Sequence, residues 1–140
     1  MKKQSVFRII DANLNRLKEA LRVIEETARL GKNHSRLTRQ AKALRHQVQA
    51  ILLEAPVSYK TLLNARNSLK DVGQRSYIRD KGKISWNDIL VSNFKRAEES
   101  ARVLEELFKL FSDKTSKQFQ VLRFKIYTLE KELLRAPLLK

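Results

Sequence analysis

The fold is decided by one stretch that occurs twice, as NLNRLKEALRVIEETARL at residues 13–30 and NFKRAEESARVLEELFKL at residues 93–110. The two copies align without a gap at an offset of 80 residues, and eight of their 18 positions are identical. Six of those eight are Asn, Arg or Glu, whereas apolar positions have diverged: Leu14 aligns with Phe94, and Ala28 with Phe108. A repeat kept only for packing would retain its apolar pattern and vary its charges. Both copies are therefore expected to present the same polar side chains for a shared purpose.

The composition is that of one folded domain. The chain has 140 residues, enough to bury an independent core, and 42% of them are hydrophobic. Three glycines and two prolines argue against an all-β fold, and the lack of cysteine excludes disulfides and thiolate metal sites. No apolar run approaches the roughly 18 residues of a membrane span. We therefore expect a soluble, cytoplasmic protein with no membrane partner.

Apolar spacing and capping signals predict two long helices in the first half of the chain. The first runs from about residue 6 to residue 30, and Gly31 is expected to end it in a left-handed conformation. The second follows an N-cap at Ser35 and ends before Pro56. Its apolar residues alternate at spacings of four and three, which is typical of a helix that packs along a coiled-coil-like seam.

Two further helices are predicted in the second half. The third begins at Ser85, with Asp88 three residues later as an approximate capping box, and runs to about Phe111. The fourth repeats the apolar seam of the second helix and ends at Pro137. Each half of the chain is thus a helix-turn-helix unit, and the unit is used twice.

The predicted fold class is all-α, a four-helix bundle made of two duplicated helical hairpins related by a pseudo-two-fold axis. The first hairpin spans about residues 6–55 and the second about residues 85–136 of a single domain. An irregular linker at about residues 56–84 joins them, with a short helix expected at residues 58–65. A connection this long inside a compact bundle is more often functional than idle.

The net charge of +15 suggests an anionic partner, either a nucleic acid or a phosphorylated small molecule. The charge is not spread evenly. Five basic residues between Lys32 and Arg45 have no acid among them, and a second basic cluster lies at residues 66–83. The repeated helices themselves are nearly balanced in charge, so part of the excess can be an ordinary solvated surface.

A helical wheel places Asn13 and Arg16 inside the apolar arc of the first helix, with Glu19 at its edge. Asn93 and Arg96 occupy the same wheel positions in the second copy. A buried guanidinium must be paired with an anion, because unpaired burial costs several kcal/mol. That anion can be a bound ligand or a carboxylate of an internal network that fixes helix register, and the pattern alone leaves both interpretations open.

Other catalytic motifs are scarce. His34 and His46 lack a second histidine or cysteine at ligand spacing, which argues against a transition-metal site, and no phosphate-binding glycine loop is present. A magnesium site needs only one or two carboxylates together with substrate phosphates. The carboxylates that can serve are Asp11, Glu19, Asp71 and Glu99.

Three segments carry a resemblance to a known family: IDANLNRLKEALRVIEE at residues 10–26, LRH at residues 44–46 and RNSLKDVG at residues 66–73. The chain resembles the small helical domain often fused ahead of thiamine-phosphate synthase, an alternative hydroxymethylpyrimidine-phosphate kinase unrelated to the ribokinase-type enzyme. The likeness covers nearly the whole chain. The family often has Asp-Thr where this chain has Asn67-Ser68, which removes one carboxylate at position 67. No synthase barrel follows, so we expect a stand-alone version.

The resemblance implies an enzyme that transfers the γ-phosphate of ATP to 4-amino-5-hydroxymethyl-2-methylpyrimidine phosphate in thiamine biosynthesis, with ATP and Mg²⁺ as cofactors. Phosphoryl transfer is mostly positioning and charge stabilisation, which arginine and Mg²⁺ supply without a nucleophilic side chain. The residues expected to bind substrate or nucleotide are Asn13, Arg16, Arg45, His46, Arg66, Asn93, Arg96 and Glu99. The residues expected to assist catalysis and to hold Mg²⁺ are Asp11, Glu19 and Asp71.

Two other functions fit parts of the pattern. A basic helical protein that binds nucleic acid would explain the charge but would leave inward-facing Asn and Arg unexplained, so nucleic acid is the less favoured partner. An all-helical enzyme that acts on a small polyanion without ATP, similar to a chorismate-mutase bundle, would also use buried arginine. The mixed sizes of the core residues leave a homodimer open.

Overall fold

The computed structural model describes residues 1–75 and 82–139 and is all-α throughout that part of the chain, which confirms the predicted fold class. Its helices are α1 (Lys3–Glu26), α2 (Ser35–Glu54), α3 (Tyr59–Ala65), α4 (Trp86–Phe108) and α5 (Asp113–Arg135). Two short turns complete them, η1 (Thr27–Gly31), which extends α1 as a π-helix, and η2 (Ser68–Lys70). The linker prediction at residues 56–84 includes residues 76–81, which lie outside the described part.

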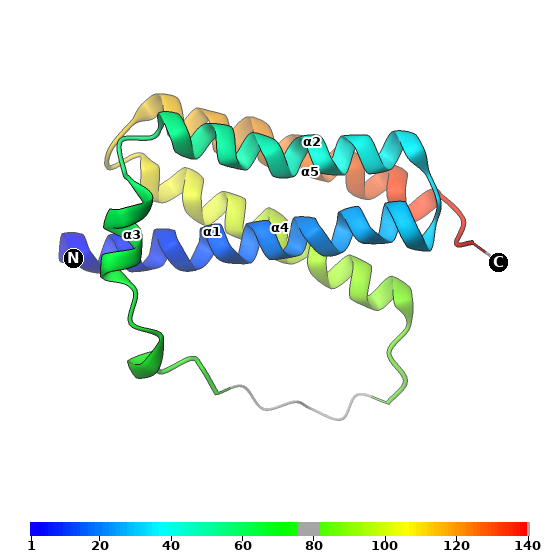
Figure 1. Ribbon diagram of the computed structural model, residues 1–140, viewed down its shortest axis with the longest axis horizontal. Coiled ribbons are helices and arrows are strands. Elements are labelled where there is room, and N and C mark those ends of the chain that lie inside the picture. Colours follow the sequence, from blue (N-terminus) through cyan, green and yellow to red (C-terminus); the bar gives the residue numbers. More distant parts are fainter. Residues whose placement is uncertain (76–81, 140) are drawn as a thin grey trace.

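The four long helices pack as two layers (Figure 1). One layer consists of α1 and α4, which run antiparallel along each other, and the other consists of α2 and α5. Within each hairpin the first helix also packs on the second, α1 on α2 and α4 on α5. The short helix α3 crosses the N-terminal half of α1, and residues 66–75 continue from it on the side of the α1–α4 layer that faces away from α2 and α5 (Figure 1).

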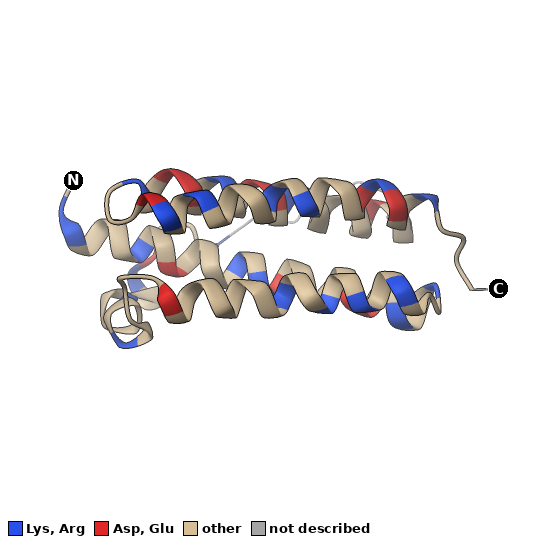
Figure 2. Cartoon of the chain, turned by 90° about the horizontal axis from the view of Figure 1, so that it is seen from above, with Lys and Arg blue, Asp and Glu red and all other residues tan. Residues whose placement is uncertain are grey.

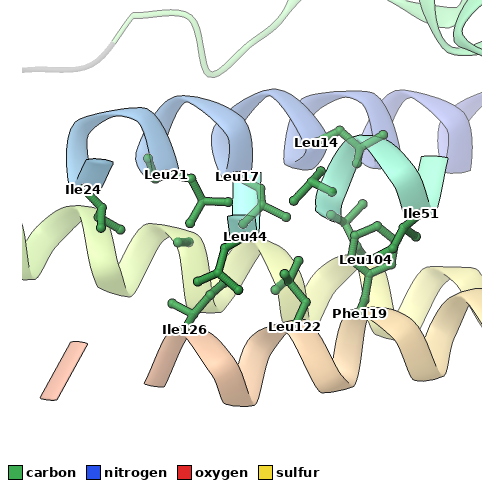
Figure 3. Close-up of a cluster of buried hydrophobic side chains, with 14 of the residues drawn as sticks. Leu14, Leu17, Leu21, Ile24, Leu44, Ile51, Leu104, Phe119, Leu122 and Ile126 are labelled. Atoms are coloured by element: carbon green, nitrogen blue, oxygen red, sulfur yellow. The ribbon is translucent and has the colours of Figure 1, made fainter. Parts of the chain in front are cut away.

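The core lies between the two layers (Figure 3). Leu17, Leu21 and Ile24 of α1 point toward Leu122 and Ile126 of α5, and all five side chains are fully buried. In the second hairpin the core contains larger rings, and Phe108 stacks on Phe119 at 5.5 Å between ring centroids. The two hairpins thus bury side chains of different size at aligned positions, since Phe94 aligns with Leu14 and Phe108 with Ala28.

Pseudo-symmetry is visible in the polar contacts of the two hairpins. The Glu25 carboxylate of α1 accepts a 2.7 Å hydrogen bond from Nε of Arg45 on α2. At the corresponding place in the second hairpin, Nε of Arg123 on α5 donates to the Glu105 carboxylate of α4 at 3.0 Å. These matched ion pairs show that the duplication extends over both helices of each hairpin.

Two helix-end predictions are wrong. Gly31 does not take the left-handed conformation, because α1 widens into the π turn and Asn33 takes the positive φ of 48° instead. The N-cap of α2 is His34 rather than Ser35, and its Nδ1 accepts from the Leu37 amide at 3.3 Å. The capping box of Ser85 and Asp88 at the start of α4 is confirmed, with both of its reciprocal hydrogen bonds present.

Candidate functional site

Asn13 and Arg16, two of the repeated polar residues of α1, lie on a face of the α1–α4 layer whose hollows include no residue of α2 or α5. Asn13 is buried and donates from Nδ2 to the Ile9 carbonyl of its own helix at 2.9 Å; Asn93 does the same to Ile89 at 2.8 Å. A side-chain amide that spends one donor on its own helix keeps its oxygen and second N–H for another partner. Asn13 and Arg16 line two adjacent hollows of this face.

Residues 66–71, called here the strap, pass beneath α1 in Figure 1. The first hollow lies between α1 and the strap and is called here the strap hollow. Its volume is about 430 Å³, within the range of about 300–1,000 Å³ usual for small-molecule sites. Cationic side chains enter it from two sides, Arg8 and Arg16 from α1 and Arg66 from the strap. Amide and hydroxyl groups of Asn13, Asn67 and Ser68 lie among them. This is the donor set expected around a phosphate.

Arg66 is fixed at the strap hollow by Asp11 of α1. Its Nε and Nη2 donate to the two Asp11 oxygens at 2.7 and 2.8 Å, a bidentate pair. The Asp11 carboxylate is buried and raises the pKa of Arg66 through these hydrogen bonds. The pair connects α1 to the segment that follows α3, so it holds the strap across the open face of α1.

The second hollow lies between α1 and α4 and also has a volume of about 430 Å³; it is called here the crossing hollow. Arg16 from one copy of the repeat and Arg96 from the other both line it, together with Lys95 and Glu99. Because α1 and α4 run antiparallel, equivalent residues of the two copies meet where the helices cross. The crossing hollow therefore joins the polar groups of both repeats in one site.

Arg16 and Arg96 are exposed, so their prediction as buried residues is wrong. The wheel places them inside the apolar arc, but in the described part of the chain the hollows that they line include no residue of α2 or α5. Within residues 1–75 and 82–139 neither guanidinium forms an ion pair, and neither does that of Arg8. Unpaired cations around two concave surfaces fit ligand binding better than an internal network.

Arg45 and His46, predicted to reach phosphates, lie elsewhere. Arg45 is paired with Glu25, which is 12 residues and about 18 Å along α1 from Asn13. That hydrogen bond lowers the pKa of Glu25, and the pair serves the hairpin rather than the hollows. His46 is exposed on α2, in the opposite layer.

The carboxylates predicted for Mg²⁺ are separated by the fold. Asp71 lines the strap hollow, and one of its oxygens accepts from the Gly73 amide at 2.8 Å. Asp11 lines the same hollow but uses both oxygens on Arg66, and exposed Glu19 is not among the residues that line either hollow. Within the described residues no group of three or more His, Cys, Asp or Glu converges as a metal cluster. Asp71, together with substrate phosphates, thus fits a magnesium site best.

Sequence reasoning missed Arg8 and Lys95. Arg8 lies outside the repeat and is exposed, so no pattern distinguished it from other surface cations. Lys95 aligns with Asn15, so the two copies differ at this position.

None of the described helices is long and apolar enough to cross a bilayer.

Comparison with known proteins gives a consistent family assignment. A model of the ThiD2 family matches residues 8–132. Proteins named thiamine-phosphate synthase from Nostoc punctiforme and Thermosynechococcus vestitus are 37% and 36% identical over 132 and 136 residues, which cover 94% and 96% of this chain. These matches cover 36% and 37% of those relatives, so the chain spans about a third of the length of the curated relatives it matches. No solved structure matches the chain.

Proposed function

The chain belongs to the ThiD2 family, and we propose from this membership that it is an ATP-dependent kinase. Its proposed acceptor is 4-amino-5-hydroxymethyl-2-methylpyrimidine phosphate, and its product is the corresponding diphosphate. The family and the relatives named thiamine-phosphate synthase indicate thiamine biosynthesis as the setting. The phosphoryl-transfer step is the finer part of the proposal and rests on the site.

The observation that carries the proposal is that two arginine-lined hollows meet at Asn13 and Arg16. A kinase must hold two polyanions with the acceptor oxygen in line with the γ-phosphorus. Two adjacent hollows that share Arg16 are compatible with this requirement, since each ligand can occupy one hollow and the transferred group can lie between them. Arg16 would then neutralise charge on the group in transfer, and Arg66 and Arg96 would hold the two ends.

The side chains of the protein need to take little part in the bond making and breaking of this reaction. An oxygen of the acceptor phosphate attacks the γ-phosphorus, the bond to the β–γ bridging oxygen breaks, and ADP leaves with that electron pair. A phosphate monoester with a second pKa of about 6 is already ionised at neutral pH, so no catalytic base is needed. Magnesium, when bound with ATP, neutralises charge on the β- and γ-phosphates. Asp71 lines the strap hollow and is the protein carboxylate that we propose would hold it.

The excess of basic residues does not favour a nucleic-acid interface. In Figure 2 the Lys and Arg residues are distributed along all the long helices. In the cluster at residues 32–45, Lys32 is buried against α5 carbonyls, Arg36 pairs with Glu132 at 2.7 Å, and Arg45 pairs with Glu25. Three of its five cations therefore serve the fold.

The test is a turnover assay with ATP, Mg²⁺ and a panel of pyrimidine alcohols and phosphates, in which products are identified by mass. The expected result is a product heavier by one phosphoryl group from the pyrimidine monophosphate, with one ADP released per product. Absence of phosphoryl transfer to any member of the panel would refute the kinase. Conversion of a polyanion without ATP would support the alternative enzyme class instead.

A further inference from the structure

A third hollow adjoins the strap hollow, and neither the acceptor phosphate nor the phosphates of ATP are assigned to it. It lies between α1, the C-terminal end of α2 and α3, has a volume of about 630 Å³, and is called here the α3 hollow. Its floor is apolar, with Leu14, Leu52, Val57 and Leu62. Its rim is polar and carries the aromatic side chain of Tyr59, which is 69% exposed. An apolar floor with a few polar groups at the rim is typical of a site for a flat organic ring.

The α3 hollow is continuous with the strap hollow. Asp11 and Asn15 line both, so the two hollows meet along one edge of α1. Arg66 lines the strap hollow and donates to Asp11, which lines both hollows. A ligand with a ring in the α3 hollow would therefore extend its phosphate directly toward Arg66.

At the equivalent place in the second hairpin, the aligned residues form an ion cluster. In the first helix of each hairpin the offset is 80, so Asn15 aligns with Lys95 and Lys18 with Glu98. In the second helix the offset is 78, as the matched ion-pair residues Arg45 and Arg123 show, so Leu52 aligns with Glu130. The Lys95 ammonium donates to Glu98 at 3.1 Å and to Glu130 at 3.2 Å. The two hairpins have thus diverged: one copy keeps a hollow where the other has charged side chains in contact.

We propose that the α3 hollow binds the pyrimidine ring of the acceptor, with its phosphate in the strap hollow; this proposal rests on the proposed function. The proposed acceptor carries its phosphate one methylene from the ring, so its ring site must adjoin its phosphate site. The adenine of ATP is separated from the γ-phosphate by ribose and two more phosphates, so its site can lie farther away. ATP accordingly enters through the crossing hollow, and the γ-phosphate meets the acceptor at Asn13 and Arg16.

Tyr59 is the residue that tests this assignment, because it is exposed and its removal leaves the core intact. Stacking of a base on an aromatic side chain is sequence-tolerant and strong enough that its loss weakens binding by about tenfold to a hundredfold. Phe124, an aromatic residue of α5 that is 58% exposed in the opposite layer, provides the matched control. Both variants, Tyr59→Ala and Phe124→Ala, are measured against wild type.

The experiment measures KM for the pyrimidine monophosphate and for ATP, and measures Kd for the monophosphate alone by calorimetry. Tyr59→Ala is expected to raise KM and Kd for the monophosphate at least tenfold and to leave KM for ATP within twofold, while Phe124→Ala changes neither. An unchanged KM and Kd for the monophosphate, or a rise in KM for ATP instead, would overturn the assignment. If wild type binds the monophosphate but transfers no phosphoryl group, the proposed function fails, and the Kd of Tyr59→Ala still decides the ring site.

Discussion

Replacement of Arg16 by methionine separates the ligand site from the packing of the bundle. Methionine retains most of the length and apolar contact of the side chain and removes its charge. Arg16 is exposed and has no ion pair within the described residues, so the change strands no carboxylate. Surface substitutions of this kind alter the free energy of unfolding by no more than about 0.5 kcal/mol. The melting temperature of Arg16→Met should therefore equal that of wild type.

The effect on turnover should be large. A charge about 4 Å from a phosphate oxygen contributes about 4 kcal/mol at an effective dielectric constant of about 20. Solvent screens an exposed group such as Arg16, so we take about 3 kcal/mol, which corresponds to roughly a hundredfold in rate. This agrees with the loss of about 10²–10³ on removal of one donor that stabilises transition-state charge. The expected outcome is at least a hundredfold fall in kcat/KM.

Arg22 of the same helix is the matched control, since it is exposed and lines neither hollow. Arg22→Met should keep near wild-type turnover, and both variants should show the same melting temperature within about two degrees. The assay follows ADP release and diphosphate formation together. Full turnover by Arg16→Met in a preparation whose wild type is active would refute the assignment of Arg16 to the transferred phosphoryl group. A strongly lowered melting temperature would show that Arg16 acts through folding.

Three further variants test other contacts. Arg66→Met should lower the free energy of unfolding by about 1–2 kcal/mol in denaturant titration, because it strands the buried Asp11 carboxylate while Arg66 itself is one-third exposed. Asp11→Asn in the same chain should recover most of the loss. Arg123→Met should cost about 3–5 kcal/mol, since its Glu105 pair is almost fully buried. Burial and the neighbouring Glu130 raise the pKa of Glu98 to about 7 from 4.5. Between these two values the folded state keeps a proton that the unfolded state has lost, so the free energy of unfolding should fall as pH rises from about 4.5 to 7. Glu98→Gln should abolish that fall in thermal melts across the range.

The repeat predicted the fold because apolar periodicity and caps act locally. The capping box at Ser85 and Asp88 is confirmed because both hydrogen bonds form within four consecutive residues. The failure at Gly31 has a local cause as well: a π turn is a rare departure from helix geometry, and it shifted the left-handed residue to Asn33. Helix existence was thus predictable, and the way one helix ended was not.

The site was predictable in part. Asn13, Arg16 and Arg96 were identified because the two copies agree there, and the structure brings them to adjacent hollows. Their exposure was not predictable from a wheel, which shows the angle of a side chain but not which neighbouring helix covers it. The bidentate pair of Asp11 with Arg66 joins residues 55 positions apart, and no local pattern specifies such a contact.

The antiparallel crossing of α1 and α4 explains why the polar residues of the repeat persisted while its core changed. A core position is surrounded by several other side chains, so a change in its size can be offset by its neighbours, and a small residue in one copy can align with a large one in the other, as Ala28 and Phe108 do. Arg16 and Arg96 instead converge on one crossing hollow, and a ligand there depends on both. Loss of either arginine removes charge from the same site and cannot be compensated by the other copy. The strap and the α3 hollow lie beside α1, whereas the residues of the second copy that align with part of the α3 hollow form an ion cluster. A symmetric pair of helices thus supports an asymmetric site, as transfer between two different ligands requires.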